Sequence, residues 1–225
     1  MKTLWPLEDA VETLPLVGKT LRQWAQEGVF SEQQLADLSY PWELLDLHQG
    51  LLERQWAREG ESKLCRIAQL ADGAALIVGE GTQVLPGVYV EGLVIAGKNC
   101  KIGPNCYLRG PISIGDDCHV GQAVELKNSI LGNGTNIGHL SYIGDSVLGN
   151  EVNLGAGTIT SNLRHDGKNH RSVVEGKILD TGRRKFGAII GHCVHTGIHT
   201  SLYPGRKLAS GVTTLPGEVV SKDKQ

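Results

Sequence analysis

The chain has 225 residues and a formal net charge of −2 at pH 7, and its charged residues are scattered along the sequence. That balance lacks the basic patch that nucleic-acid binding requires, so we expect small soluble partners and no nucleic acid. Aromatic residues make up only 5% of the chain while 30 residues are glycine, which is typical of a turn-rich β protein with an aliphatic core. No apolar run approaches membrane length, and acidic residues interrupt the N-terminal segment, so we expect a cytoplasmic protein without a membrane span.

Residues 1–72 carry a helical pattern. In LRQWAQEGV and WELLDLHQGLLERQWAREG, apolar residues recur three and four positions apart with charges between them. This spacing predicts short amphipathic helices. We expect this helical N-terminal region to form one domain and to cap one end of the structure that follows.

From residue 73 to 225 a six-residue period replaces the helical one. An aliphatic or small residue recurs at every sixth position with few exceptions, glycine follows most of these positions, and a small or branched residue comes four places later. This pattern predicts a parallel β-helix, in which three hexapeptides form one triangular coil and the coils stack. The period stops between about 161 and 187, which we interpret as a loop extruded from a coil. The residues expected to point inward are Val78, Val84, Val90, Ala96, Ile102, Leu108, Ile114, Val120, Leu126, Leu131, Ile137, Ile143, Leu148, Leu154, Thr160, Ile190, Thr196, Leu202, Leu208 and Thr214.

Three polar side chains fall on outward positions of this repeat. His139 and Tyr142 lie two and five places after an inward isoleucine, and Asn153 lies five places after an inward leucine. An imidazole can accept a proton near neutral pH, and an amine must lose a proton before it attacks a thioester. Together with Glu125 and Lys127 on a neighbouring coil, these residues predict a functional site.

The segment from about residue 90 to 162 resembles the acetyltransferase domain of the bifunctional N-acetylglucosamine-1-phosphate uridylyltransferase/glucosamine-1-phosphate acetyltransferase family. The resemblance rests on VELKNSILGNGTNIG and HLSYIGDSVLGNEVNLGAGTITSN, in which His, Tyr and Asn recur at the family's spacing. It implies a left-handed β-helix, a homotrimer, and acetyl-coenzyme A bound between neighbouring chains. The implied activity is N-acetylation of an amino-sugar 1-phosphate such as glucosamine 1-phosphate.

The resemblance also implies a role for individual residues. His139 matches the general base, and Glu125 matches the carboxylate that orients it. The residues that match ligands of the sugar phosphate are Arg109, Lys127, Tyr142, Asn153 and, by an ungapped count through a differing loop, Lys168. The residues that match contacts on the acyl-donor side are Asn162, Ala156 and His192.

The chain departs from the family mainly on the donor side. Leu163 stands where the family has tyrosine, His192 stands where it has serine, and LPGEVVSKDKQ offers no clear counterpart of a C-terminal arginine. The segment GRRKFGAIIG looks closer to archaeal-type members of the superfamily, which act on a wider set of amino-sugar phosphates. These departures leave open a catalytically silent protein of the same fold that binds or scaffolds a sugar phosphate or sugar nucleotide.

The N-terminal region resembles parts of the family's other half. WPLEDAVETLPLVGKTL is similar to a PL…LPVxGKPL stretch, and SYPWELLDLHQGLL resembles the linker that leaves the nucleotidyltransferase domain. The family's GGxGTR segment, which cradles nucleotide phosphates, does not occur in the chain. The region is therefore either a remnant of a nucleotidyltransferase or a coincidental likeness, and we expect no uridylyltransferase activity on either interpretation.

The remaining histidines, cysteines and basic residues suggest simpler roles. The five cysteines are odd in number and form no CxxC pair, so we expect reduced thiols, with Cys100, Cys106 and Cys118 at small inward positions. The spacing of the histidines does not fit a γ-class carbonic anhydrase, which shares the expected fold, and we expect no metal. In the loop, the basic residues at 183–185 fit either a solvated tip or a contact with a phosphate of coenzyme A.

Overall fold

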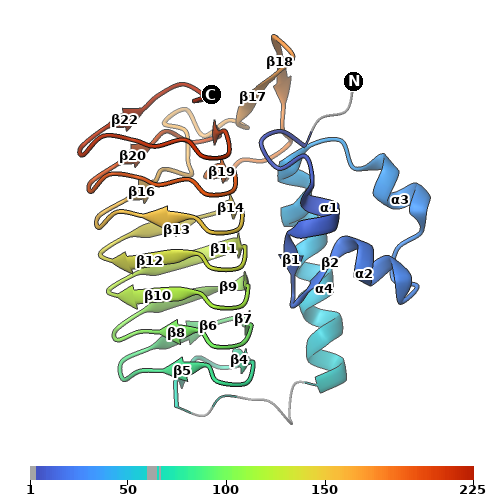
Figure 1. Cartoon of the computed structure of the whole chain (residues 1–225), viewed down its shortest axis with the longest axis vertical. Coiled ribbons are helices and arrows are strands. Elements are labelled where there is room, and N and C mark those ends of the chain that lie inside the picture. The colour runs from blue at the N-terminus through green and yellow to red at the C-terminus, as the bar shows by residue number, and fades with distance from the viewer. Residues whose placement is uncertain (1–3, 60–64, 66) are drawn as a thin grey trace.

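Strands that lie three hexapeptides apart pair in parallel register, as Glu125 does with Tyr107 and Leu126 with Leu108. The computed structural model, which describes residues 4–59, 65 and 67–225, therefore confirms a left-handed parallel β-helix of stacked triangular coils (Figure 1). Each coil runs along three faces, and strands of successive coils pair on each face.

The long strands β9 (Tyr107–Ile114) and β11 (Glu125–Leu131) turn from one face to the next within one coil. Face 1 holds their first parts together with β3 (Gln69–Leu70), β6 (Tyr89–Glu91), β13 (Tyr142–Gly144), β16 (Ile159–Thr160), β20 (Ser201–Leu202) and β22 (Val219–Val220). Face 2 holds their second parts with β4 (Ala75–Val78), β7 (Leu93–Ala96), β14 (Val147–Leu148), β19 (Ala188–Ile190) and β21 (Arg206–Leu208). Face 3 holds β5 (Gln83–Val84), β8 (Lys101–Ile102), β10 (His119–Gln122), β12 (Asn136–His139) and β15 (Asn153–Leu154).

The core inside the coils follows the predicted period. Every residue expected to point inward is buried except Val78, which is half-buried and packs against the same core. The small inward positions of Cys100, Cys106 and Cys118 are also buried, and the thiols are unpaired. The sequence period thus determines the register of the whole stack, since each coil buries its own row of aliphatic side chains.

The N-terminal region lies along face 2, so the prediction that it caps one end of the stack is wrong (Figure 1). Outward residues of face 2 such as Ile77, Ile95 and Ile130 are buried together with leucines of the helices. An apolar stripe on an outer face must be covered, and a long helix beside it does so. The elements of this region are α1 (Ala10–Thr13), β1 (Pro15–Leu16), β2 (Lys19–Thr20), α2 (Leu21–Gln26), α3 (Glu32–Asp37), η1 (Pro41–Glu43) and α4 (Leu44–Glu59).

The helices themselves agree with the sequence pattern. The two predicted amphipathic segments form α2 and α4, and α2 and α3 each begin at a capping box, made by Thr20 with Gln23 and by Ser31 with Gln34. Capping of this kind satisfies two backbone N–H groups that a helix start otherwise leaves open. The division of the chain at residue 72 stays a prediction; residues 1–3, 60–64 and 66 of that proposed domain lie outside the described residues.

The segment 161–187 leaves the stack at the corner between faces 1 and 2 and contains an antiparallel hairpin, β17 (Arg171–Val174) with β18 (Lys177–Asp180). The segment packs against both the β-helix and the N-terminal region. Phe186 is fully buried, and its ring packs edge-on against Trp42 of the N-terminal region and against His170. The segment therefore fills the junction between the coils and the helices.

Candidate active site

Face 1 carries two adjoining columns of polar side chains. Tyr107, Glu125 and Tyr142 occupy one register position on successive coils. Arg109 and Lys127 pair at the next outward position, two residues further along the strands. Strands in a sheet lie about 4.8 Å apart, so side chains at one register position touch. The repeat of the sequence thereby brings four of the predicted site residues together on one surface.

Arg109 is held by carboxylates. Its Nη1 donates a hydrogen bond of 2.9 Å to Glu125 Oε1, and its Nε lies 3.8 Å from Glu91 Oε2. The guanidinium carbon lies 5.4 Å from the centroid of the Tyr107 ring. The hydrogen bond that Arg109 donates to Glu125 is the main reason that the pKa of Arg109 is raised.

Asp145 is the central acceptor of the site, and the sequence analysis missed it. Its carboxylate is almost fully buried and accepts hydrogen bonds from Lys127 Nζ at 3.0 Å and Asn128 Nδ2 at 2.8 Å. Asn162 Nδ2 donates a further bond of 2.6 Å. A buried carboxylate is stable only when such donors surround it. The signal available in the sequence was an aspartate directly after Tyr142, Ile143 and Gly144 in the quoted motif.

Asn162 connects this carboxylate to Tyr142. Its Nδ2 also lies 2.9 Å from the Tyr142 hydroxyl oxygen, to which it donates. Burial, followed by the charges of Asp145 and Glu125, raises the pKa of Tyr142, so its hydroxyl stays protonated and can donate in turn. The backbone oxygen of Asn162 accepts from Phe186 N at 3.0 Å and lies 3.2 Å from His170 Nε2. The inserted segment thus fixes Asn162 in place.

His139 lies exposed at the end of β12, on the corner between faces 3 and 1, three residues before Tyr142. Among the residues that the structure describes, its ring makes no hydrogen bond with Glu125, whose carboxylate is bonded to Arg109 instead. The predicted orienting contact between Glu125 and His139 is therefore absent from the single chain. The physical reason is that the Arg109 guanidinium stands directly beside Glu125 on the same face and is the stronger partner.

The remaining predicted residues are spread over other parts of the stack. Asn153 is exposed on face 3, where it pairs in register with Asn136. Ala156 lies on the His139 corner, where Gly157 N donates to the His139 carbonyl oxygen at 3.1 Å. Lys168 is exposed in the inserted segment, and its backbone N donates to Asp166 Oδ1 at 3.2 Å.

His192, which the family resemblance matches to a contact with the acyl donor, lies at a different corner of the stack from His139. His192 lies on the corner between faces 2 and 3, where Nδ1 accepts from Asn150 N and Nε2 lies 2.9 Å from Asp9 Oδ1. Both ring nitrogens are thus engaged, Nδ1 within the β-helix and Nε2 with the N-terminal region. The residue that follows Ala156 on the next coil of the His139 corner is Ile198, because His199 N donates to the Ala156 carbonyl oxygen.

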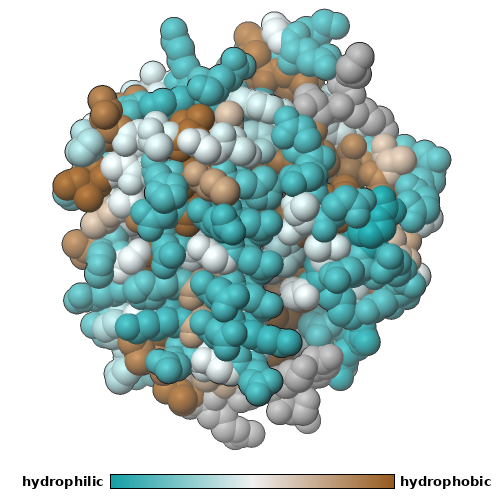
Figure 2. Space-filling view, viewed as in Figure 1, coloured by the Kyte–Doolittle hydropathy of each residue, from teal (hydrophilic) through white to brown (hydrophobic). Residues whose placement is uncertain are grey.

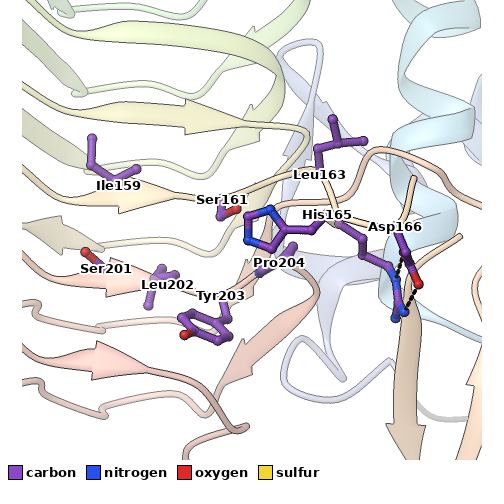
Figure 3. Close-up of a pocket in the computed structure, with 10 residues that line it drawn as sticks. Ile159, Ser161, Leu163, His165, Asp166, Ser201, Leu202, Tyr203 and Pro204 are labelled. Atoms are coloured by element: carbon purple, nitrogen blue, oxygen red, sulfur yellow. Dashed lines mark hydrogen bonds and ion pairs between the residues drawn. The ribbon is translucent and has the colours of Figure 1, made fainter. Parts of the chain in front are cut away.

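A groove of about 640 Å³ opens on face 1 beyond Tyr142, where Ile159 follows Tyr142 in register. Figure 3 shows Ile159, Leu163 and Tyr203 among its lining side chains. Arg164 and Asp166 also line the groove and form an ion pair. The groove is mostly apolar, and its lining residue Ile159 is the register neighbour of Tyr142 in the polar cluster. It can therefore seat an extended, partly apolar molecule or a side chain of a second protein.

The described part of the chain contains no group of three or more His, Cys, Asp or Glu side chains arranged to hold a metal ion. Within that same part, no helix has the length and apolar character to span a membrane.

Comparison with known proteins confirms the resemblance stated from the sequence. Residues 90–200 match the family model described as the GMPPB C-terminal domain. A bifunctional sugar-1-phosphate nucleotidylyltransferase/acetyltransferase from Sulfurisphaera tokodaii is 38% identical over 191 residues, which cover 83% of this chain and 46% of the relative. A bifunctional protein GlmU from Methanococcus aeolicus is 33% identical over 229 residues, covering 99% of this chain and 54% of the relative.

The chain thus spans about half the length of these curated relatives. Among solved structures, a hexapeptide transferase family protein from Anaplasma phagocytophilum matches with 20% identity and a TM-score of 0.26, over 68% of this chain and 73% of that protein. That likeness is too low to carry a functional conclusion.

Proposed function

Because the chain resembles the left-handed β-helix acetyltransferase domain of bifunctional sugar-1-phosphate enzymes, we propose that it is an acetyl-coenzyme A-dependent N-acetyltransferase. Its acceptor is an amino-sugar 1-phosphate such as glucosamine 1-phosphate. The observation that supports this most is the bonded cluster of Lys127, Asp145, Asn162 and Tyr142 next to the exposed His139 corner. Convergent polar groups beside a groove are the usual mark of a site.

The proposed chemistry follows from the positions of these groups. The neutral amine of the sugar attacks the thioester carbon, and His139 accepts the proton that the amine loses. The tetrahedral intermediate then collapses, the carbon–sulfur bond breaks, and the coenzyme A thiolate leaves and takes up a proton. Among the backbone N–H groups near the corner, those of Gly155 and Gly157 are already donated within the stack, so the Ala156 N–H is the candidate that stabilises the oxyanion.

Binding of the acceptor uses face 1. Tyr142 presents its hydroxyl to the sugar, and Asn162, which matches a contact on the acyl-donor side, is bonded to that hydroxyl. Asn153 lies on the adjacent face for contact from a neighbouring chain. Arg109 and Lys127 supply positive charge for the phosphate, although both also neutralise carboxylates of the protein. Acetyl-coenzyme A would lie along the His139 corner between chains of a homotrimer, with Ala156 and Ile198 toward it.

The test is the release of free thiol when the protein is mixed with acetyl-coenzyme A and glucosamine 1-phosphate. We expect release that depends on both substrates, with N-acetylglucosamine 1-phosphate as the product. Release no faster than the hydrolysis of acetyl-coenzyme A alone would contradict the proposal for this acceptor. Repeating the assay with galactosamine 1-phosphate and free glucosamine distinguishes the sugar from the phosphate as the recognised feature.

A second candidate function is a silent protein that binds a sugar phosphate without acetylating it. It is favoured by the bonding of Glu125 to Arg109, which leaves His139 without the carboxylate that would orient its ring. Titration calorimetry that detects binding of glucosamine 1-phosphate but none of acetyl-coenzyme A would favour this candidate.

A further inference from the structure

A second pocket, distinct from the groove on face 1, lies at the corner between faces 1 and 2. It has a volume of about 410 Å³ and forms where the inserted segment rejoins the coils, opposite the start of α4. The residues that line it are Asp46, Asp145, Thr181, Gly182, Arg183, Arg184 and Lys185. We call it the Arg184 pocket. Asp145 belongs both to this pocket and to the cluster on face 1.

The charges around the Arg184 pocket do not cancel. Asp46 forms an ion pair with Arg183, and Asp145 forms one with Lys127. Arg184 and Lys185 are exposed, and neither has a carboxylate within ion-pair distance among the residues that the structure describes. Two positive charges therefore remain at the wall of the pocket after the internal pairs are counted.

The predicted phosphate ligands on face 1, in contrast, lie in a region where the net charge is negative. Arg109 and Lys127 stand among the carboxylates of Glu91, Glu125 and Asp145, so negative charges outnumber positive ones there. A phosphate monoester carries nearly two negative charges at neutral pH, and a surrounding excess of carboxylates opposes its binding. The cations of face 1 alone do not supply the charge that such a group needs.

The basic residues of the Arg184 pocket are held close to the cluster by the backbone. Lys185 forms an antiparallel bridge with Leu163, and Phe186 N donates to the Asn162 carbonyl oxygen at 3.0 Å. Gly187 N donates to the Asp145 carbonyl oxygen at 2.8 Å, and a side chain at Gly187 would come within 2.0 Å of the Gly144 carbonyl oxygen. The chain segment that carries Arg184 and Lys185 is thus fixed directly beside Asn162 and Asp145.

From this geometry we propose that the Arg184 pocket binds a phosphate monoester, with Arg184 and Lys185 as its ligands. The planar guanidinium can donate two parallel hydrogen bonds to phosphate oxygens, while the ammonium adds a point charge. Two molecules of the proposed reaction carry such a group, the sugar 1-phosphate and coenzyme A with its terminal phosphate. The shared residue Asp145 and the neighbouring Asn162 favour the sugar phosphate. The choice of source rests on the proposed function, whereas the phosphate site itself does not.

The first experiment measures binding of inorganic phosphate to the full chain by titration calorimetry at low salt. The double variant Arg184→Gln/Lys185→Gln removes both ligands from exposed positions, so the fold is retained. We expect its affinity for phosphate to fall by about tenfold for each lost charge-assisted contact. The matched control Lys177→Gln removes an exposed lysine of the same segment that lies on β18 outside the pocket, and it should bind phosphate like the wild type.

The result that overturns the proposal is equal phosphate affinity of the double variant and the control, or no phosphate binding by the wild type. This outcome is independent of acetyl transfer, so it is distinguishable from failure of the proposed function.

The second experiment identifies the source of the phosphate by steady-state kinetics. If the sugar phosphate occupies the pocket, the double variant raises the Michaelis constant for glucosamine 1-phosphate and leaves that for acetyl-coenzyme A unchanged. The reverse pattern assigns the pocket to coenzyme A. In that case wild type and double variant should have the same Michaelis constant for acetyl-dephospho-coenzyme A, a donor that lacks the phosphate monoester. Unchanged Michaelis constants for both substrates overturn the assignment of the pocket to either.

Discussion

At the residue scale, His139 is the group on which the proposed chemistry depends. If it accepts the proton of the amine, His139→Ala should lower turnover by about 10²–10⁴-fold, the usual contribution of general acid–base catalysis. Its side chain is exposed, so the free energy of unfolding should change by no more than about 0.5 kcal/mol. Turnover by thiol release and stability by denaturant unfolding test both parts. An intact rate in a folded variant would remove His139 from the mechanism.

Asp145 gives a second prediction at this scale, because its carboxylate holds three donors of the site. Asp145→Asn would place an amide against Lys127 and the two asparagines that now donate to the carboxylate. We expect the free energy of unfolding to fall by about 1–3 kcal/mol, the penalty for an unmatched buried polar group, with weaker binding of the sugar phosphate.

The matched control for this variant is Asp116→Asn. Asp116 Oδ1 accepts the backbone N–H of Lys98, and Asn133 and Asn150 make the same contact on the following coils. Asparagine is therefore already suited to this corner, and the substitution should change stability little. Chemical denaturation of both variants provides the comparison. A loss of stability that is equal in the two would show that Asp145 has no special role.

The same residues show how far the sequence could predict the site. The six-residue period places Arg109, Glu125, Lys127 and Tyr142 on one face, because register follows from period alone. The choice of partner for each charge does not follow from period. Asp145 competes for Lys127 at a distance of 3.0 Å, and such competition depends on side-chain geometry that no spacing in the sequence encodes.

At the element scale, α4 carries a buried histidine with a consequence for stability in acid. His48 is fully buried, and among the described residues neither ring nitrogen has a hydrogen-bond partner. Burial lowers the pKa of His48 to about 3 from its ordinary value of 6.5. Below pH 6.5 the unfolded chain therefore binds a proton that the folded chain excludes. The contribution of His48 to the free energy of unfolding is fully present above about pH 6.5 and is lost progressively as the pH falls toward 3.

The measurement is the free energy of unfolding at pH 7 and pH 5 for the wild type and for His48→Leu. Each pH unit below 6.5 should cost about 1.4 kcal/mol through His48, so the wild type should lose about 2 kcal/mol more than the variant between these two values. Leucine also removes an unpaired polar group, so the variant should be no less stable at pH 7. Parallel acid profiles of the two proteins would contradict the buried, neutral state of His48.

The sequence predicted that α4 is a helix but not where it lies on the β-helix. Amphipathic spacing identified α2 and α4 because apolar residues recur at the helical period. It did not show what their apolar sides cover. The signal was in the β-helix, where Ile77, Ile95 and Ile130 stand at outward positions of one face. Outward isoleucines at one register position, with Ser113 on the coil between Ile95 and Ile130, need a cover. A helical region beside the stack provides that cover, which a cap at the end of the stack could not.

At the scale of the whole molecule, one corner of the β-helix remains apolar and uncovered. Leu140 is 63% exposed, Ile198 51% and Leu215 73%, and all three lie on the His139 corner. Figure 2 shows hydrophobic side chains along the edge of the β-helix that lies away from the N-terminal helices. Face 2 is closed by the chain's own helices, whereas this corner and the two faces that it joins, 1 and 3, stay open to another protein. A ridge of apolar side chains on an exposed edge indicates an interface with further chains.

We therefore expect a homotrimer whose neighbouring chains meet at the His139 corner, so that a second chain completes the donor side of the site. Sedimentation velocity at micromolar concentration should give three chains per particle. Ile198→Lys/Leu215→Lys places two like charges in that contact and should yield monomers that have lost acetyl transfer while keeping their fold.

The control Ile178→Lys changes an isoleucine that is 67% exposed on β18, outside the corner, and should remain trimeric and active. A monomeric wild type would contradict both the proposed trimer and the proposed site between chains. Active monomers of the double variant would retain the chemistry but place the whole site within one chain.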